Sequence, residues 1–308
     1  MVESPHHKTK RVGIDISSSG TTAIVLNADD SILAEKTIRD LGSNSSVAGI
    51  TSLIESLRAD LHDFDRIGIS VPGLVDRKSG RIEFSSSIPG HSETDLAAEV
   101  EAATGVRVLL ENDANAAAFG EFSVGAGRGS VDMFYATLGE GVGGAFILDG
   151  KIWRGAGGFA GEFGHMPINS EGTRLEQMVS AANIVRRTRS RFHQDSTSSL
   201  RHDGEETITL ADIISAAERQ DDFAQMMLKR TGRYVGGALA GVINLFNIET
   251  VVIGGEIMTA KHLVLDSIRK RARELSFAPA FNSTRIVEGS LGGRAAAIGA
   301  AIISHSAE

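Results

Sequence analysis

Two polar side chains, Asn112 and Asp113, stand between an apolar run and an alanine-rich run in the stretch 111–121. The apolar run 106–110 is typical of a buried strand, and the residues after Asp113 favour a helix. Ligands of α/β sheets bind where strands end, so these side chains are expected at a binding edge. These residues have two interpretations. Either Asp or Asn is a helix N-cap that accepts a hydrogen bond from the first-turn amides, or Asp113 is a general base that accepts a substrate proton. By itself the stretch favours the cap.

Three short turns rich in small residues follow predicted strands, and their backbone amides could hold phosphate. In the first turn, Asp15 could also orient a hydrated magnesium ion, although the same residues suit an ordinary β-hairpin. None of the turns has the spacing of a P-loop or a Rossmann fingerprint, but their matching positions in the two halves of the chain support one another. The candidate nucleotide-binding residues are Asp15, Ser17, Ser18 and Ser19 in the first turn, Gly139, Glu140 and Gly141 in the second turn, and Gly254, Gly255 and Glu256 in the third turn.

A fourth glycine-rich segment, 154–166, surrounds one carboxylate and one imidazole with small residues. Small residues allow a ligand to approach the backbone closely. Glu162 and His165 could therefore exchange hydrogen bonds with sugar hydroxyls. A lone histidine is more often structural, but the density of glycine here favours a site.

The elements that must position these residues form two similar halves. Each half has the pattern strand–strand–strand–helix–strand–helix–strand–helix, which predicts two α/β domains with a cleft between them. We expect an N-terminal domain over 11–124 and a C-terminal domain over 125–290, with the last helix, 291–304, packing back on the first domain. One continuous helix is predicted over 175–192. The polar segment 193–206 is predicted to be a mobile surface loop.

Composition narrows the class of function. The net charge is −8 and there are no cysteines, which argues against nucleic-acid binding and excludes disulfides, thiolate metal sites and a cysteine nucleophile. The polar N-terminus does not resemble a signal peptide, and no apolar run reaches membrane length, so a cytoplasmic protein without membrane contact is expected. About ten residues precede the first predicted strand, which leaves no room there for a helix-turn-helix domain.

The four turns and the stretch 111–121, in this order, resemble the ROK family (repressor, open reading frame, kinase) from about residue 11 to 304. The most specific matches are 111–121 and 138–166, and supporting matches are 71–76, 251–255 and 291–301. The resemblance implies two actin/hexokinase-like (ribonuclease H-like) domains. It implies either a kinase that phosphorylates hexoses or N-acetylhexosamines with ATP and magnesium, or a sugar-responsive repressor. It also implies a homodimer.

The resemblance assigns roles to individual residues. Asp113 matches the catalytic base, and Asn112 matches the residue that binds a neighbouring sugar hydroxyl. Glu162, His165 and Glu176 match sugar-binding positions, and Gly73 lies in the loop that borders the sugar. Phosphoryl transfer needs positioning and charge stabilisation more than covalent chemistry, which fits these residue types.

The chain departs from the family's kinases mainly on the nucleotide side. Three serines replace the usual Gly-Gly-Thr after Asp15, Glu140 replaces a Thr or Ser, and Glu256 replaces a Gly. The family's zinc site, which pairs a His at the position of His165 with three cysteines, is excluded because the chain has no cysteine.

Two hypotheses follow from these matches and departures. One is an ATP-dependent sugar kinase with Asp113 as base. The other is a non-catalytic, sugar-sensing protein of the regulator type with a degenerate nucleotide site. On the sugar side, Ser87 and His91 stand where Asn and Trp are common in the family. The identity of the sugar is therefore left open.

Overall fold

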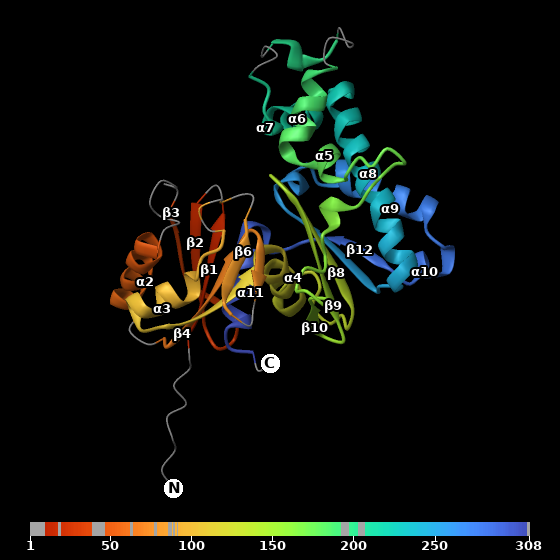
Figure 1. The fold of residues 1–308 in the computed structure, drawn as a ribbon. Coiled ribbons are helices and arrows are strands. Elements are labelled where there is room, and N and C mark those ends of the chain that lie inside the picture. Colours follow the sequence, from red (N-terminus) through yellow and green to blue (C-terminus); the bar gives the residue numbers. More distant parts are fainter. Residues whose placement is uncertain are drawn as a thin grey trace. The chain divides into compact units, whose positions relative to one another are not determined.

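In the computed structural model the chain forms two compact units (Figure 1). Unit 1 comprises Met1–Arg128, Arg154–Ala160 and Gly293–Glu308, and unit 2 comprises Gly129–Trp153 and Gly161–Gly292. The structure describes residues 10–17, 20–38, 47–61, 64–76, 79–85, 88, 90, 92–191, 197–202 and 207–306.

Unit 1 contains a five-stranded mixed sheet in the order β3-β2-β1-β4-β7. β1 pairs antiparallel with β2 and parallel with β4, and β4 pairs parallel with β7. The carboxyl ends of three neighbouring strands therefore meet at one edge of the sheet. The elements of this unit are β1 (Arg11–Ser17), β2 (Gly20–Leu26), β3 (Ile32–Ile38), α2 (Val47–Leu61), β4 (Arg66–Val71), β5 (Leu74–Asp76), β6 (Arg81–Phe84), α3 (Leu96–Thr104), β7 (Arg107–Asn112), α4 (Asp113–Val124) and α11 (Ala295–Ile303).

The two faces of this sheet are covered by different helices. Ile14 and its alternate neighbours in β1 are buried against apolar side chains of α2 and α3. On the other face α11 lies directly on the strands, because a Cβ atom at Gly13 would stand 1.9 Å from the carbonyl oxygen of Ala297, and one at Gly68 would stand 2.0 Å from that of Ala300. The contact of α11 with α4 is equally close at Gly299. The blue C-terminal helix in Figure 1 is therefore a structural layer of unit 1.

Unit 2 repeats the same sheet order with β10-β9-β8-β11-β12. β8 pairs antiparallel with β9 and parallel with β11, and β11 pairs parallel with β12. Its elements are β8 (Met133–Leu138), β9 (Val142–Leu148), β10 (Lys151–Trp153), the 3-10 helix η2 (Phe163–His165), α5 (Glu176–Val179), α6 (Ala181–Arg189), η4 (Ser199–His202), α7 (Leu210–Glu218), α8 (Asp222–Phe246), β11 (Thr250–Gly254), η5 (Glu256–Ala260), α9 (His262–Leu275), α10 (Ala278–Asn282), β12 (Arg285–Glu288) and η6 (Gly292–Arg294), the last of which crosses into unit 1.

The predicted α/β fold of two similar halves is confirmed by these matching sheets. The predicted continuous helix over 175–192 is wrong. Ser180 takes an extended conformation (φ −66°, ψ 156°) that separates α5 from α6. Between β11 and α9 the chain forms the short 3-10 helix η5.

The segment 193–206, predicted to be a mobile loop, is described only in part. Residues 193–196 and 203–206 lie outside the described ranges. Between them Ser199–His202 forms η4, and Leu200 is buried. Ser198 and Ser199 donate hydrogen bonds to the Asp221 carboxylate at the start of α8. These contacts tie the described part of the segment to unit 2.

Candidate functional site

The carboxyl edge of the unit 1 sheet gathers several polar side chains. In the pairing register, Asp15 of β1 is opposite Ser70 of β4, and Ser70 is opposite Glu111 of β7. The Ser70 hydroxyl donates a hydrogen bond of 2.7 Å to Asp15 Oδ1. Asp113 follows β7 as the first residue of α4. The polar cluster is therefore produced by the parallel order of three strands.

Asp15 and Asp113 are close enough to interact electrostatically. Burial of the Asp15 carboxyl and the negative charge of Asp113 raise the pKa of Asp15 to about 7, against the opposing effect of the Ser70 hydrogen bond. Two acidic groups held near each other in this way suit chemistry that needs a charged and a protonated oxygen, or that needs a cation between them. A pKa shift of this size is typical of functional sites, although ion-pair networks also produce it.

Asn112 is the N-cap of α4 and also fixes its surroundings. Its side-chain oxygen accepts the backbone N–H of Asn115 at 3.0 Å. Its Nδ2 donates to Asp113 Oδ1 at 3.0 Å and to the Gly73 carbonyl at 2.9 Å. The cap interpretation of the sequence is thus correct for Asn112, and the same side chain orients the Asp113 carboxylate and holds the Gly73 loop.

Gly73 cannot carry a side chain in this loop. Its φ is +133°, and a Cβ atom there would stand 2.3 Å from the Phe84 carbonyl oxygen. The hydroxyl of Ser85 holds the same loop by donating to the Pro72 carbonyl at 2.6 Å. The loop therefore presents backbone rather than side chains beside Asn112.

Sequence reasoning assigned no role to Glu111 and Arg154. Glu111 is 4% exposed, and its carboxylate pairs with the guanidinium of Arg154, which begins the glycine-rich segment. Its other oxygen accepts the backbone N–H of Asn112 at 3.1 Å and Asn115 Nδ2 at 3.0 Å. A buried carboxylate needs such partners, so Glu111 stabilises the start of the helix that carries Asp113.

We expect Arg154→Ala to lower the free energy of unfolding by about 2 kcal/mol, because it leaves the Glu111 carboxylate buried without its cation. The expected loss is smaller than the cost of breaking a fully buried ion pair, because the Arg154 side chain is 25% exposed. Urea denaturation measures the change, and Arg128→Ala, at an exposed arginine of the same unit, is the control. Equal stability of the two variants would contradict this role.

In unit 2, Glu162 and His165 lie at the two ends of one short turn. Glu162 is the N-cap residue of η2, and the His165 N–H donates to the Glu162 carbonyl at 3.1 Å. Both residues are exposed, whereas Phe163 and Gly164 between them are buried. The buried pair anchors η2 to β9 and leaves both polar side chains facing outward.

Glu176, matched to a sugar contact, is engaged with the second glycine turn. Its Oε2 accepts the backbone N–H of Val142 at 2.9 Å. The turn is further fixed by the Ala181 N–H, which donates to the Gly139 carbonyl at 2.8 Å. The α5–α6 segment thus supports the β8–β9 turn from two points.

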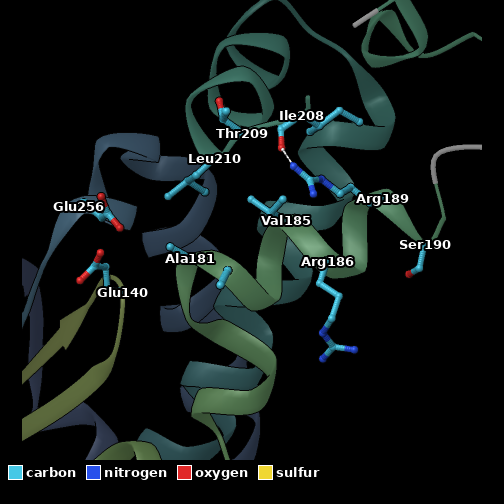
Figure 2. A pocket seen from close by; sticks show the side chains of 11 residues that line it. Glu140, Ala181, Val185, Arg186, Arg189, Ser190, Ile208, Thr209, Leu210 and Glu256 are labelled. Carbon is cyan, nitrogen blue, oxygen red and sulfur yellow. Dashed lines mark hydrogen bonds between the residues drawn. The ribbon is translucent and has the colours of Figure 1, made fainter. Parts of the chain in front are cut away.

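A cavity of about 820 Å³ in unit 2 opens beside this turn (Figure 2). The volume is within the range of small-molecule sites. Glu140 and Glu256 lie at one end, and their carboxylates point toward one another. Partial burial and the charge of Glu140 raise the pKa of Glu256 above its usual range. The remaining lining residues are Ala181, Ala182, Val185, Arg186, Arg189, Ser190, Ile208, Thr209 and Leu210.

The two glycines of the third turn are required by close packing. A Cβ atom at Gly255, where φ is +93°, would stand 2.3 Å from the Leu138 carbonyl oxygen, and one at Gly254 would stand 2.3 Å from Tyr135 Oη. The turns 138–141 and 254–256 therefore lie against each other beside the cavity.

The first turn is described only in part. Ser17 donates its hydroxyl to the Gly20 carbonyl at 3.0 Å, which closes the β1–β2 hairpin. The predicted candidates Ser18 and Ser19 lie outside the described residues, as do Ser87 and His91. Among the predicted nucleotide residues, Asp15 belongs to unit 1, and the residues of the second and third turns belong to unit 2.

Comparison with known proteins decides the family. Residues 11–307 match the model of the ROK family. The chain belongs to the ROK family. Because it contains no cysteine, it lacks the cysteine-containing zinc motif. None of the helices in the described ranges combines the length and apolar character needed to cross a membrane.

Glucokinases and a transcriptional regulator are similar to this chain. A glucokinase of Thermotoga maritima is 31% identical over 309 residues, which cover 96% of this chain and 97% of the relative. The crystal structure of a ROK family glucokinase from Streptomyces griseus in complex with glucose and AMPPNP has a TM-score of 0.83, 30% identity and coverage of 96% and 99%. A ROK family transcriptional regulator, a homolog of the E. coli MLC protein, has a TM-score of 0.85, 28% identity and coverage of 97% and 78%.

Proposed function

We propose that this ROK protein is an ATP-dependent kinase of a hexose or N-acetylhexosamine. The observation that carries the proposal is the cluster of Asp15, Asn112 and Asp113 at the carboxyl edge of the unit 1 sheet. Similarity to two glucokinases over nearly their whole length supports it. Two interacting carboxylates, one of them held by an amide donor, suit a proton acceptor beside a cation-binding group.

In this proposal Asp113 acts as general base. Its carboxylate takes the proton of a sugar hydroxyl while the hydroxyl oxygen forms a bond to the γ-phosphorus of ATP and the bond from that phosphorus to the bridging oxygen breaks, leaving ADP. Asn112 keeps the Asp113 oxygen in place through its Nδ2–H. Magnesium supplies charge neutralisation on the phosphates, and Asp15 would hold it through water once its carboxyl has lost its proton.

In unit 2, the proposal assigns Glu162 and His165 to sugar hydroxyls. Their exposure on one rigid turn supports this assignment. Glu176 has one oxygen engaged by Val142 N–H, so its other oxygen is the one assigned to sugar. The base and ribose of the nucleotide are assigned to the cavity lined by α6 and the start of α7. The backbone of the second and third turns is assigned to the phosphates.

A second candidate is a non-catalytic sugar sensor of the regulator type. Glu140 and Glu256 favour it, because two carboxylates at the cavity end oppose phosphate. Similarity to a transcriptional regulator over 97% of this chain also favours it. The two candidates differ in nucleotide use, not in sugar binding.

Asn112 both caps α4 and orients Asp113, and two substitutions at this position separate these roles. Asn112→Ser retains a good cap oxygen but removes the Nδ2 donor to Asp113 and Gly73, whereas Asn112→Ala removes both. We expect the alanine variant to lose about 1 kcal/mol of stability and the serine variant only a few tenths. Both should lose kinase activity by about tenfold, the effect of one lost positioning hydrogen bond. Full activity of the serine variant would contradict the positioning role.

Isothermal titration calorimetry separates the two candidates. Mg-ATP is titrated with and without glucose, N-acetylglucosamine or N-acetylmannosamine. The kinase proposal expects heat from Mg-ATP and from one sugar of the panel. Binding of a sugar with no binding of Mg-ATP would favour the sensor.

The expected homodimer stays a prediction, which light scattering behind a sizing column tests. The predicted domain boundaries at 124/125 and 290/291 also stay a proposal. Limited proteolysis followed by mass spectrometry of the fragments tests them.

A further inference from the structure

Two carboxylates lie over the second glycine turn at one end of the unit 2 cavity. A Cβ atom at Gly139 would stand 3.7 Å from Cγ of Glu256, so the Glu256 side chain lies directly against this turn. Glu140 is the next residue of the turn, and Figure 2 shows the two carboxylates facing each other. The charge of Glu140 acts on Glu256 strongly enough to contribute to its raised pKa. The end of the cavity beside the turn backbone is therefore negatively charged.

The rest of the cavity has a different character. Its wall is apolar where α6 faces the start of α7, through Val185 and Leu210 among others. The two arginines of the lining donate to neutral oxygens: Arg189 to the Ile208 carbonyl at 2.8 Å and Arg186 to Asn183 Oδ1 at 3.0 Å. An apolar wall suits the flat ring of a nucleobase, whereas the carboxylate end repels an anionic phosphate chain.

Resting on the kinase proposal, we propose that Glu140 and Glu256 act as a charge filter on the phosphate donor. The cavity binds an uncharged nucleoside or a metal-complexed nucleoside triphosphate and discriminates against the metal-free triphosphate. A divalent cation offsets the charge of the phosphates, and its water ligands can donate hydrogen bonds to the two carboxylates. The donor therefore has to arrive with its metal.

The test uses the full chain and the double variant Glu140→Gln/Glu256→Gln. The variant keeps side-chain size and removes both charges, and because both residues are exposed it is expected to fold. Glu218→Gln/Asp222→Asn removes the same charge from exposed residues outside the cavity lining and is the matched control. Calorimetry measures the Kd of adenosine, of ATP in excess EDTA and of Mg-ATP for all three proteins.

The filter predicts that metal-free ATP binds the Glu140→Gln/Glu256→Gln variant about 10- to 100-fold more tightly than it binds the wild type or the control. Adenosine should bind all three proteins equally, and Mg-ATP should gain less than metal-free ATP. Higher salt should narrow the difference for metal-free ATP by screening the repulsion.

Two results would overturn the filter, and they differ in what they say about the kinase. If adenosine and Mg-ATP bind but metal-free ATP binds the wild type and the double variant equally, the filter is wrong and the kinase proposal stands. If no adenosine compound binds any of the proteins while a sugar does, the cavity is not a nucleotide site and both proposals fail.

Discussion

Asp113→Asn should lower kcat for sugar phosphorylation by about 10²- to 10⁴-fold, the usual contribution of a general base. The amide can still accept the Asn112 Nδ2–H and Ala114 N–H bonds that Asp113 Oδ1 accepts, so the start of α4 should keep its geometry. KM for the sugar should change little, because the proton is transferred only in the transition state. Initial rates of ADP formation over a range of sugar concentrations measure both constants.

Asp95→Asn is the matched control for this prediction. Asp95 also stands at the start of a helix of unit 1, is exposed, and makes no side-chain cap bond. Its substitution should leave kcat unchanged. A kcat of Asp113→Asn within a factor of about three of the wild type would remove Asp113 from the role of base, since a lost base costs at least about 10²-fold.

As the pH rises from 4 to 7, the free energy of unfolding of the wild type should fall relative to that of the Asp15→Asn variant. The pKa of Asp15 is raised from 3.8 to about 7 in the folded protein. Across this interval the folded chain keeps a proton that the unfolded chain has released, so rising pH disfavours folding until both forms are ionised. The shift corresponds to a loss on the order of 2–4 kcal/mol, discounted because the side chain is only partly buried.

Urea denaturation in EDTA at several pH values from 4.5 to 8 measures this difference. The asparagine of the Asp15→Asn variant can still accept the hydrogen bond of the Ser70 hydroxyl but cannot titrate. Subtracting the pH curve of the variant from that of the wild type therefore removes the contributions of all other titrating groups. At pH 8 in EDTA the variant should be the more stable protein, and replacing the EDTA by magnesium should stabilise only the wild type. Parallel pH curves for the two proteins would show that Asp15 is not held protonated.

The polar edge of unit 1 is the part of the site that local sequence could predict. An apolar strand, a polar pair and an alanine-rich helix follow one another, and this order fixes where Asn112 and Asp113 lie. The two sheets were predictable for the same reason, because each half repeats one pattern of apolar runs. The pattern does not show that one side chain, Asn112, both caps the helix and orients its neighbour.

Contacts between distant residues explain most of what the sequence did not reveal. The pair of Glu111 and Arg154 joins residues 43 apart, and nothing in either local stretch indicates the other partner. Glu176 was matched to sugar by its position in the family, whereas its bond to the Val142 N–H depends on how α5 packs on the β8–β9 turn. The break at Ser180 had no Gly or Pro to mark it.

Glu140 and Glu256, in the second and third turns, show a different limit of prediction from sequence. The sequence identified Glu140 and Glu256 separately as departures from kinase turns. Their joint effect depends on the packing of one turn against the other, which brings both carboxylates to the same end of the cavity. That proximity converts two separate substitutions into one electrostatic feature.

The most direct test of the central claim is the formation of a sugar phosphate. The purified protein is incubated with Mg-ATP and each of glucose, N-acetylglucosamine and N-acetylmannosamine, and phosphorus NMR follows ATP, ADP and sugar phosphate. The account predicts ADP and sugar phosphate in equal amounts with at least one of these sugars, and their formation at least about 10²-fold more slowly with Asp113→Asn. Saturable binding of a sugar to the wild type without formation of sugar phosphate would contradict it.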